Sequence, residues 1–365
     1  MSYSRTTAHS PYMEFAKLHT GARFNLATSG VMEYPLAELP VRLQDLEING
    51  PTIYGYPPLQ ELLARKNDVP VECVVASTGT SMANHLAMAA TFDPGDEVLI
   101  EEPTYELLVS TALYLGGVVR RFPRRFEEDF RINPEEIAKH ITPRTRLIVI
   151  TNLHNPSGAL TDSDTLRAVG EIARRSRARV LVDEVYLEAL FEQPARSAFH
   201  LSSHFLSTNS LTKAYGLSGL RCGWILAESD LAKRIWRLND LFAATPAHPA
   251  ELLSVIALNH LPRIAARAQQ LLDTNRKRVN EFLDHRDDLQ CFRPLFGTVM
   301  FPRLKKGSVD RLGELLGQKY DACIAPGRFF EMPEHFRLGM GGAAEMTAEA
   351  LDRLGRCLDE LSRSV

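Results

Sequence analysis

The chain has 365 residues, of which 45% are hydrophobic and 24% are charged, and its formal net charge is −3 at pH 7. This composition is typical of a soluble globular enzyme, and the length allows two or three domains of ordinary size. A slightly acidic chain without a large basic block offers no electrostatic support for binding nucleic acid. It also contains no run of about 18 apolar residues, so we expect no membrane span.

The charged and sulfur-containing residues are spread widely along the chain. Arg-Arg pairs at 120–121, 124–125 and 174–175 are scattered, so we expect them on solvated faces. The five cysteines form no C-x-x-C pair, which argues against a disulfide framework or a zinc site and favours reduced thiols. The N-terminal residues lack an apolar core of signal-peptide length. We therefore expect a cytoplasmic protein with no bound metal.

Residues 1–24 are polar and weakly periodic, so we expect an arm or a short leading helix there. Apolar runs then alternate with helical patterns, and this alternation implies right-handed crossovers in a parallel or mixed sheet covered on both faces. The predicted strands lie at 73–76, 97–100, 118–122, 146–151, 179–183, 204–207 and 222–227. The predicted helices between them lie at 81–91, 107–115, 134–140 and 161–175.

The chain becomes mostly helical after about residue 229. A long helical pattern at 247–285 is interrupted at Pro262, because proline cannot sit in a helix interior without disrupting it. Short strands are expected around 297–303 and 335–339, followed by a helix near 346–362. We interpret this last part as a smaller α/β domain.

The most informative motif is the stretch at 210–223, in which Lys213 lies among small and hydroxyl residues. Burial would lower the pKa of this lysine and free its amine to form a Schiff base with an aldehyde cofactor. Ser210 and Arg221 add a hydroxyl and a permanent cation, which suit a phosphate group. A surface lysine in a polar loop is the alternative interpretation of this segment taken alone.

Polar residues also follow the ends of predicted strands, where ligands of parallel α/β sheets bind. Asp183 ends an apolar strand, and Asn155 and Ser210 follow two others. A buried aspartate is costly unless it is paired, and a protonated pyridine nitrogen is a fitting partner. The alternative role for this aspartate is a helix cap.

The turn at 77–81 links a predicted strand to a helix, and it contains Gly79, Thr80 and Ser81. Backbone N–H groups and hydroxyls at a helix N-terminus form an anion site, assisted by the helix dipole. A plain helix cap is the alternative. No Gly-Lys-Ser/Thr follows, so this is not a P-loop.

Together these motifs resemble those of the class I/II aminotransferases, which are pyridoxal-phosphate-dependent enzymes of fold type I. The resemblance runs from about Asn25 to about Gly342, although Cys222 replaces the aliphatic residue that usually follows the arginine. It implies an α/β fold with a mostly parallel seven-stranded sheet covered by helices, plus a smaller α/β domain. The implied parts are an arm with part of the small domain (1–45), a large cofactor domain (46–240), connecting helices (241–285) and a small C-terminal domain (286–365).

The resemblance also implies how pyridoxal phosphate is bound. Lys213 would hold the cofactor covalently and move protons, Asp183 would face the pyridine nitrogen, and Tyr105 would stack on the ring. Tyr186 and Asn155 would bond the phenolic oxygen. The implied phosphate cup consists of Gly79, Thr80, Ser81, Ser210 and Arg221.

Other implied contacts involve the substrate and a second subunit. Arg337 lies in an apolar context and suits a bidentate grip on an α-carboxylate, with Asn155 and Gly30 beside it. Tyr54 or Tyr56 would reach the phosphate of the neighbouring subunit, so the resemblance implies a homodimer. We interpret His154 as a structural residue of the loop, because the lysine can itself move protons.

The function that this resemblance implies is amino transfer between an L-amino acid and a 2-oxo acid with ping-pong kinetics. A C–S lyase and an aminocyclopropane-carboxylate-synthase-like enzyme remain open, because the cofactor performs the difficult chemistry on a shared scaffold. A transcription regulator is disfavoured, since no basic domain precedes the motifs.

Overall fold

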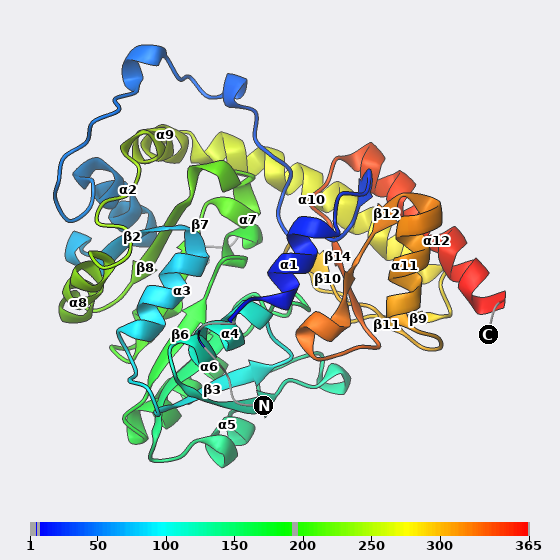
Figure 1. Ribbon diagram of the computed structural model, residues 1–365, viewed down its shortest axis with the longest axis horizontal. Coiled ribbons are helices and arrows are strands. Elements are labelled where there is room, and N and C mark those ends of the chain that lie inside the picture. The colour runs from blue at the N-terminus through cyan, green and yellow to red at the C-terminus, as the bar shows by residue number, and fades with distance from the viewer. Residues whose placement is uncertain (1–4, 6–7, 192–195, 364–365) are drawn as a thin grey trace.

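A computed structural model describes residues 5, 8–191 and 196–363 (Figure 1). Its centre is a seven-stranded sheet with the order β2-β8-β7-β6-β5-β3-β4. Strand β8 runs antiparallel to β2 and β7, and the other neighbouring pairs are parallel, so the sheet is mixed as expected. The strands are β2 (Val74–Thr78), β3 (Glu97–Glu102), β4 (Val118–Pro123), β5 (Thr145–Thr151), β6 (Arg179–Asp183), β7 (Phe205–Ser210) and β8 (Cys222–Leu226).

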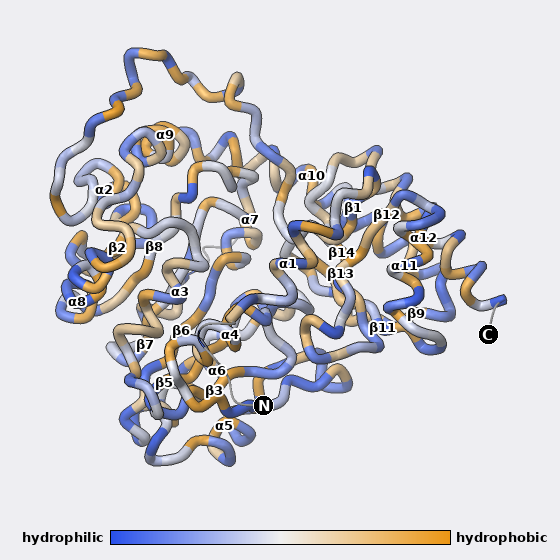
Figure 2. Tube along the Cα trace, viewed as in Figure 1, coloured by the Kyte–Doolittle hydropathy of each residue, from blue (hydrophilic) through white to orange (hydrophobic). Residues whose placement is uncertain are grey.

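Apolar side chains on both faces explain why strand β5 contains a continuous hydrophobic run. In β5, Leu147 and Val149 belong to one buried cluster, whereas Ile148 and Ile150 belong to another. Alternate residues of a strand point to opposite faces, so each face of the sheet has its own core. Figure 2 shows the same pattern as hydrophobic colour along β3 and β8.

Helices cover both faces of this sheet. Helix α3 packs on one face through Ala83 and Leu86, and α6 packs on the other through Leu166 and Val169. Asp162 caps α6 by accepting a hydrogen bond from the Thr165 N–H at 2.8 Å. The helices of this part are α2 (Pro57–Asn67), α3 (Gly79–Ala89), α4 (Glu106–Tyr114), α5 (Pro134–His140), α6 (Ser163–Arg175), α7 (Thr212–Tyr215), α8 (Ser229–Asn239) and α9 (His248–Asn259).

The C-terminal part contains short strands and long helices. Its sheets have the orders β10-β14-β13, β11-β9 and β1-β12. Helix α1 (Pro11–Leu18) and strand β1 (Phe24–Asn25) come from the N-terminus, and β1 pairs in parallel with β12. The remaining elements are α10 (Leu261–Asp284), β9 (Leu289–Gln290), β10 (Val299–Met300), β11 (Arg303–Leu304), α11 (Val309–Tyr320), β12 (Ala322–Cys323), β13 (Ala325–Pro326), β14 (Phe336–Gly339) and α12 (Ala344–Arg363).

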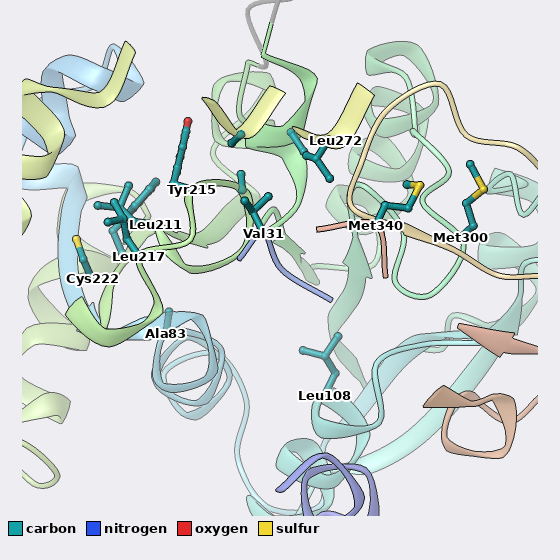
Figure 3. Packing of buried hydrophobic residues seen from close by; sticks show 14 of the residues in the cluster. Val31, Ala83, Leu108, Leu211, Tyr215, Leu217, Cys222, Leu272, Met300 and Met340 are labelled. Carbon is teal, nitrogen blue, oxygen red and sulfur yellow. The ribbon is translucent and has the colours of Figure 1, made fainter. Parts of the chain in front are cut away.

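The largest hydrophobic cluster is continuous between these two parts. It includes Leu217 near the central sheet, Cys222 of β8, Val31 of the N-terminal segment, Leu272 of α10, and Met340, which follows β14. Figure 3 shows Val31 lying between the group around Leu217 and the side chain of Met340. The segment at 26–34 is therefore packed into the structure rather than lying loosely over it.

Several predicted elements differ from the observed ones. The helix expected from 81 begins at Gly79, and the strand expected to end at 207 continues to Ser210. The expected interruption of the 247–285 pattern is present, because α9 ends at Asn259 and α10 begins at Leu261, so that Pro262 lies in the first turn of α10. Proline is tolerated in a first helical turn because its missing N–H would be unpaired there anyway. The solvated position expected for Arg124 is wrong, because this residue is only 1% exposed.

Candidate active site

A cavity of about 280 Å³ lies at the carboxyl ends of β5, β6 and β7. Its position agrees with the rule that parallel α/β sheets bind ligands where their strands end. Most of the predicted site residues line it, namely Thr80, Ser81, Tyr105, Asn155, Asp183, Tyr186, Ser210, Lys213 and Arg221.

Lys213 lies on α7, immediately after β7. Its Nζ donates a hydrogen bond to Ser29 Oγ at 2.9 Å, and its carbonyl accepts one from the Val31 N–H at 2.8 Å. Burial lowers its pKa to about 8, with the Arg337 charge acting in the same direction. A Cβ at Gly30 would lie 3.3 Å from Lys213 Cδ, so Gly30 permits the close approach of the N-terminal segment.

Asp183 ends β6 and is almost completely buried. Its carboxylate accepts hydrogen bonds from Asn84 Nδ2 at 2.8 Å and from the Val185 N–H at 3.1 Å. Burial raises its pKa to about 6, although both hydrogen bonds favour the charged form. Asn84 is itself oriented, because its Oδ1 accepts a hydrogen bond from Thr208 Oγ1 at 2.5 Å.

One end of the cavity is suited to an anion. Thr80 and Ser81 lie in the first turn of α3, an 11-residue helix whose N-terminal N–H groups and dipole favour negative charge. Gly79 has φ +76°, and a Cβ there would come within 2.4 Å of Arg221 Nη2. The absence of a side chain at Gly79 thus lets the guanidinium of Arg221 approach this turn.

Arg337 lies in β14 and is completely buried. Its guanidinium donates to Asn155 Oδ1 at 2.9 Å, to the Tyr12 hydroxyl at 2.5 Å and to the Ala27 carbonyl at 3.3 Å. It also lies 5.4 Å from the ring centre of Tyr12 and 4.9 Å from that of Phe330. These contacts hold a permanent cation next to the cavity-lining Asn155.

Two of the tyrosines that line the cavity, Tyr105 and Tyr186, are neutral phenols at neutral pH. Burial raises the pKa of Tyr186 to about 12 and places that of Tyr105 well above its ordinary value. The Tyr105 ring makes an edge contact with Tyr12, with ring centres 5.5 Å apart. Both tyrosines can therefore donate a hydroxyl proton at neutral pH.

Tyr54 lies outside this cavity and is 55% exposed, and its hydroxyl donates to Asp240 Oδ2 at 2.8 Å. Tyr56 instead packs its ring against His248. Because the expected contact of Tyr54 involves a second subunit, it stays a prediction. His154 is buried; its Nε2–H donates to the Pro103 carbonyl at 2.9 Å, so Nδ1 accepts from Ser157, as expected of a structural residue.

Sequence reasoning missed three residues at the site. Asn84 lies three positions after Ser81 on α3, and residues at this spacing share a helix face, so the helical pattern could have found it. Ser29 and Tyr12 lie in the N-terminal segment, far in sequence from their partners Lys213 and Arg337. No sequence signal predicted these two contacts.

Two further observations concern the described ranges of the chain. Within them, no cluster of three or more His, Cys, Asp or Glu side chains could hold a metal ion. None of the helices placed there has the length and apolar character needed to cross a membrane.

Comparison with known proteins identifies the family. The family model for class I and II aminotransferases matches residues 43–354. The chain belongs to this family. Enzymes of the family are pyridoxal-phosphate-dependent transferases, so the cofactor of this chain is pyridoxal phosphate.

Three relatives illustrate the range of the family. Capreomycidine synthase from Streptomyces vinaceus is 30% identical, and the match covers 87% of this chain and 85% of the synthase. Arginine–pyruvate transaminase from Pseudomonas aeruginosa is 29% identical, and the match covers 80% of this chain and 76% of the transaminase. A pyridoxal-phosphate-dependent aminotransferase from Streptococcus suis, known from a crystal structure, is 25% identical in sequence. The two structures superpose with a TM-score of 0.90 over 96% of this chain and 97% of that one.

The residues around the cavity fit pyridoxal phosphate. The Thr80 hydroxyl is buried and has no hydrogen-bond partner within the described part of the chain, which suits a phosphate oxygen. Arg221 and the start of α3 provide positive charge at the same end of the cavity. Asp183 provides a carboxylate for a protonated ring nitrogen, and Lys213 provides an amine of lowered pKa. Each polar part of the cofactor therefore has a chemically matched partner.

Proposed function

We propose that the protein transfers an amino group between an L-amino acid and a 2-oxo acid by a ping-pong mechanism. The observation that supports this most is the pairing, at one cavity, of the Lys213 amine with a pKa of about 8 and the buried Arg337 cation beside it. A base and a carboxylate-binding group that are both buried away from bulk water suit deprotonation of an amino acid at its α-carbon.

The cofactor would be held by the residues that the cavity brings together. Lys213 would bind it covalently, Asp183 would face its ring nitrogen, and Tyr105 would lie on its ring. Its phenolic oxygen would accept hydrogen bonds from Tyr186 and Asn155. Its phosphate would lie in the cup made by Gly79, Thr80, Ser81, Ser210 and Arg221. When bound, pyridoxal phosphate supplies an aldehyde and an electron-withdrawing ring.

The substrate carboxylate would be bound by Arg337, with Asn155 and the backbone near Gly30 beside it. The guanidinium fork binds a carboxylate in two parallel hydrogen bonds, which fixes the orientation of the amino acid. Lys213 Nζ, freed from the cofactor when the amine of the substrate displaces it, would then take the α-proton and hold it. Because its pKa is about 8, an appreciable fraction of the amine is unprotonated near neutral pH.

Helix α1 would exclude water from this reaction. Tyr12, Met13 and Ala16 from this helix line the cavity, and the Tyr12 hydroxyl contacts Arg337. A carboxylate that reaches Arg337 must therefore share its guanidinium with Tyr12 or displace that hydroxyl. Exclusion of water strengthens the electrostatic interactions within the site.

A homodimer is also part of the proposal. The segment at 36–55 arches away from the helices beside it (Figure 1) and carries Leu43 and Ile48, each 88% exposed. Leu241 is 78% exposed, and a second subunit would cover apolar side chains that are exposed in the single chain. Tyr54 lies in the same segment and would reach the phosphate of the partner subunit. The five free cysteines support a reducing, cytoplasmic location.

A second candidate function is a different reaction on the same scaffold. The relative with 30% identity is named capreomycidine synthase rather than aminotransferase. A cyclisation, a β-elimination of the C–S lyase type or aminocyclopropane-carboxylate-synthase-like chemistry would use the same residues. The products distinguish these reactions, because only amino transfer moves nitrogen to the 2-oxo acid.

The experiment that tests the proposed function traces the amino nitrogen of the donor amino acid with an isotope label. The holoenzyme is incubated with ¹⁵N-labelled L-amino acids together with a 2-oxo acid. Arginine is included because the Pseudomonas aeruginosa relative is named for it. Amino transfer predicts ¹⁵N in the new amino acid and an equal amount of the donor's 2-oxo acid. Release of ¹⁵N-ammonia or of a cyclic product would instead support the second candidate.

Borohydride reduction followed by peptide mapping tests the assignment of Lys213. The proposal predicts that the reduced cofactor is attached to the peptide containing Lys213. Lys66 is a suitable internal comparison, because it is engaged by Glu188 at 2.6 Å and does not line the cavity. A label on another lysine would refute the assignment.

A further inference from the structure

A fully buried ion pair lies behind the cavity. Arg124 Nη1 and Glu101 Oε2 are 2.8 Å apart, and both side chains are 0% exposed. Glu101 belongs to β3, and Arg124 directly follows β4. Neither residue lines the cavity. A buried ion pair is expensive to form and is weak support for a stability role, so another reason for its presence is needed.

Three hydrogen bonds of this pair reach Thr151, at the end of β5. Glu101 Oε1 accepts from the Thr151 N–H at 2.7 Å and from the Thr151 hydroxyl at 2.6 Å. Arg124 donates to the Phe130 carbonyl at 2.6 Å and to the Thr151 carbonyl at 3.4 Å. The backbone and the side chain of Thr151 are thus both held by the ion pair.

Thr151 in turn orients the backbone of Asn155 through its hydroxyl. A carboxylate only accepts hydrogen bonds, so the hydroxyl proton of Thr151 must point toward Glu101. The lone pairs of that hydroxyl then remain for the Asn155 N–H, which donates to Thr151 Oγ1 at 2.9 Å. The Asn155 carboxamide in turn accepts from Arg337 at 2.9 Å. A directed chain of hydrogen bonds therefore joins the ion pair to the carboxylate-binding arginine.

We infer that Glu101 and Arg124 are positioning residues, which act through Thr151 to align Asn155 with Arg337. The kinetic part of this inference rests on the proposed function, whereas its structural part concerns the Asn155 loop alone. A pair that only joined β3, β4 and β5 would stabilise the fold without ordering Asn155.

Thr151→Val and Thr151→Ser provide a matched comparison. Valine has nearly the shape of threonine, but its side chain neither donates to Glu101 nor accepts from Asn155, whereas serine keeps the hydroxyl. The ion pair is intact in both variants, so both are expected to fold. Glu101→Gln is the second variant: it keeps the shape of Glu101 and an acceptor for Thr151 but removes the charge that faces Arg124.

The first readout does not depend on activity. Hydrogen–deuterium exchange of the peptide containing Asn155 is measured by mass spectrometry in the full-length protein, with and without pyridoxal phosphate. Thr151→Val removes the acceptor of the Asn155 N–H, so the exchange rate of this N–H is expected to rise about tenfold. The rate in Thr151→Ser is expected to be close to that of the wild type. Glu101→Gln is expected to give a rate between those of Thr151→Ser and Thr151→Val.

The second readout is the split between KM and kcat. Thr151→Val is expected to raise the KM for the donor amino acid about fivefold to tenfold while kcat changes less than about twofold, because a carboxylate-binding contact is loosened. Equal exchange and equal KM in Thr151→Val and Thr151→Ser would overturn the inference. If the wild type transfers no nitrogen but the exchange difference is found, the proposed function fails and the positioning of Asn155 stands.

Discussion

Replacement of Lys213 by methionine should stabilise the protein when the cofactor is absent. The buried ammonium is held in an unfavourable environment, because its pKa falls from the ordinary value of 10.5 to about 8 on folding. Each pKa unit corresponds to about 1.4 kcal/mol, so at pH 7 this burial costs about 3 kcal/mol. Loss of the hydrogen bond to Ser29 offsets about 1 kcal/mol. The expected net gain is about 2 kcal/mol.

The pH dependence gives this prediction its sign. The folded-state pKa lies below the unfolded-state value, so between pH 8 and 10.5 the unfolded chain binds the proton that the folded chain has lost. The wild type therefore gains stability as the pH rises through this window, and Lys213→Met does not. The advantage of the variant should be full below pH 8 and close to zero at pH 10.

Equilibrium urea unfolding of the cofactor-free proteins measures this difference. The fluorescence of Trp224 and Trp236, which are both buried, reports unfolding at one fixed protein concentration. Lys277→Met is the matched control, because Lys277 is 79% exposed and its loss should change stability by less than about 0.5 kcal/mol. The reasoning would be refuted if Lys213→Met were less stable than the wild type at pH 7. It would also be refuted if the variant's gain in free energy of unfolding were as large at pH 10 as at pH 7.

Three further substitutions address the cofactor and the substrate. Gly79→Ala would place a Cβ 2.4 Å from Arg221 Nη2 at a φ of +76°. We therefore expect the Kd for pyridoxal phosphate, measured by absorbance, to rise about tenfold. Gly317→Ala is the control and should leave this Kd unchanged, because the space around Gly317 is open. Arg337→Lys should raise the KM for the donor amino acid about 10-fold to 100-fold because the bidentate fork is lost, and an unchanged KM would exclude Arg337 as the carboxylate group. Asp183→Asn should slow the single-turnover reaction about 100-fold while the cofactor stays bound, and an unchanged rate would count against its role.

The sequence predicted the central sheet well because most of its strands are buried on both faces. Each predicted strand between 73 and 227 has an observed counterpart, and the Asn133 cap of α5 is present, with its side chain accepting from the Glu135 N–H at 2.9 Å. Long apolar runs and capping residues are local signals. The two-residue strands β12 and β13 were missed, since pairs of residues have no periodicity to detect.

The site was predicted where motifs lie at strand ends and missed where distant segments meet. Asp183 ends one strand of the sheet, and Asn155 and Lys213 follow two others, so topology alone brings them together. Tyr12 reaches Arg337 only through the packing of α1 against the rest of the chain. The burial of Arg124 was also missed, because an Arg-Arg pair in sequence does not reveal that one member has a buried carboxylate partner.

The most direct test of the account is an absorption titration of the purified holoenzyme, with Lys213→Ala in parallel. We expect a visible cofactor band that an L-amino acid abolishes and a 2-oxo acid then restores, with no such cycle in the variant. No visible band after addition of pyridoxal phosphate would contradict the assignment of the cavity. A band that the amino acid leaves unchanged, with ammonia released, would contradict amino transfer.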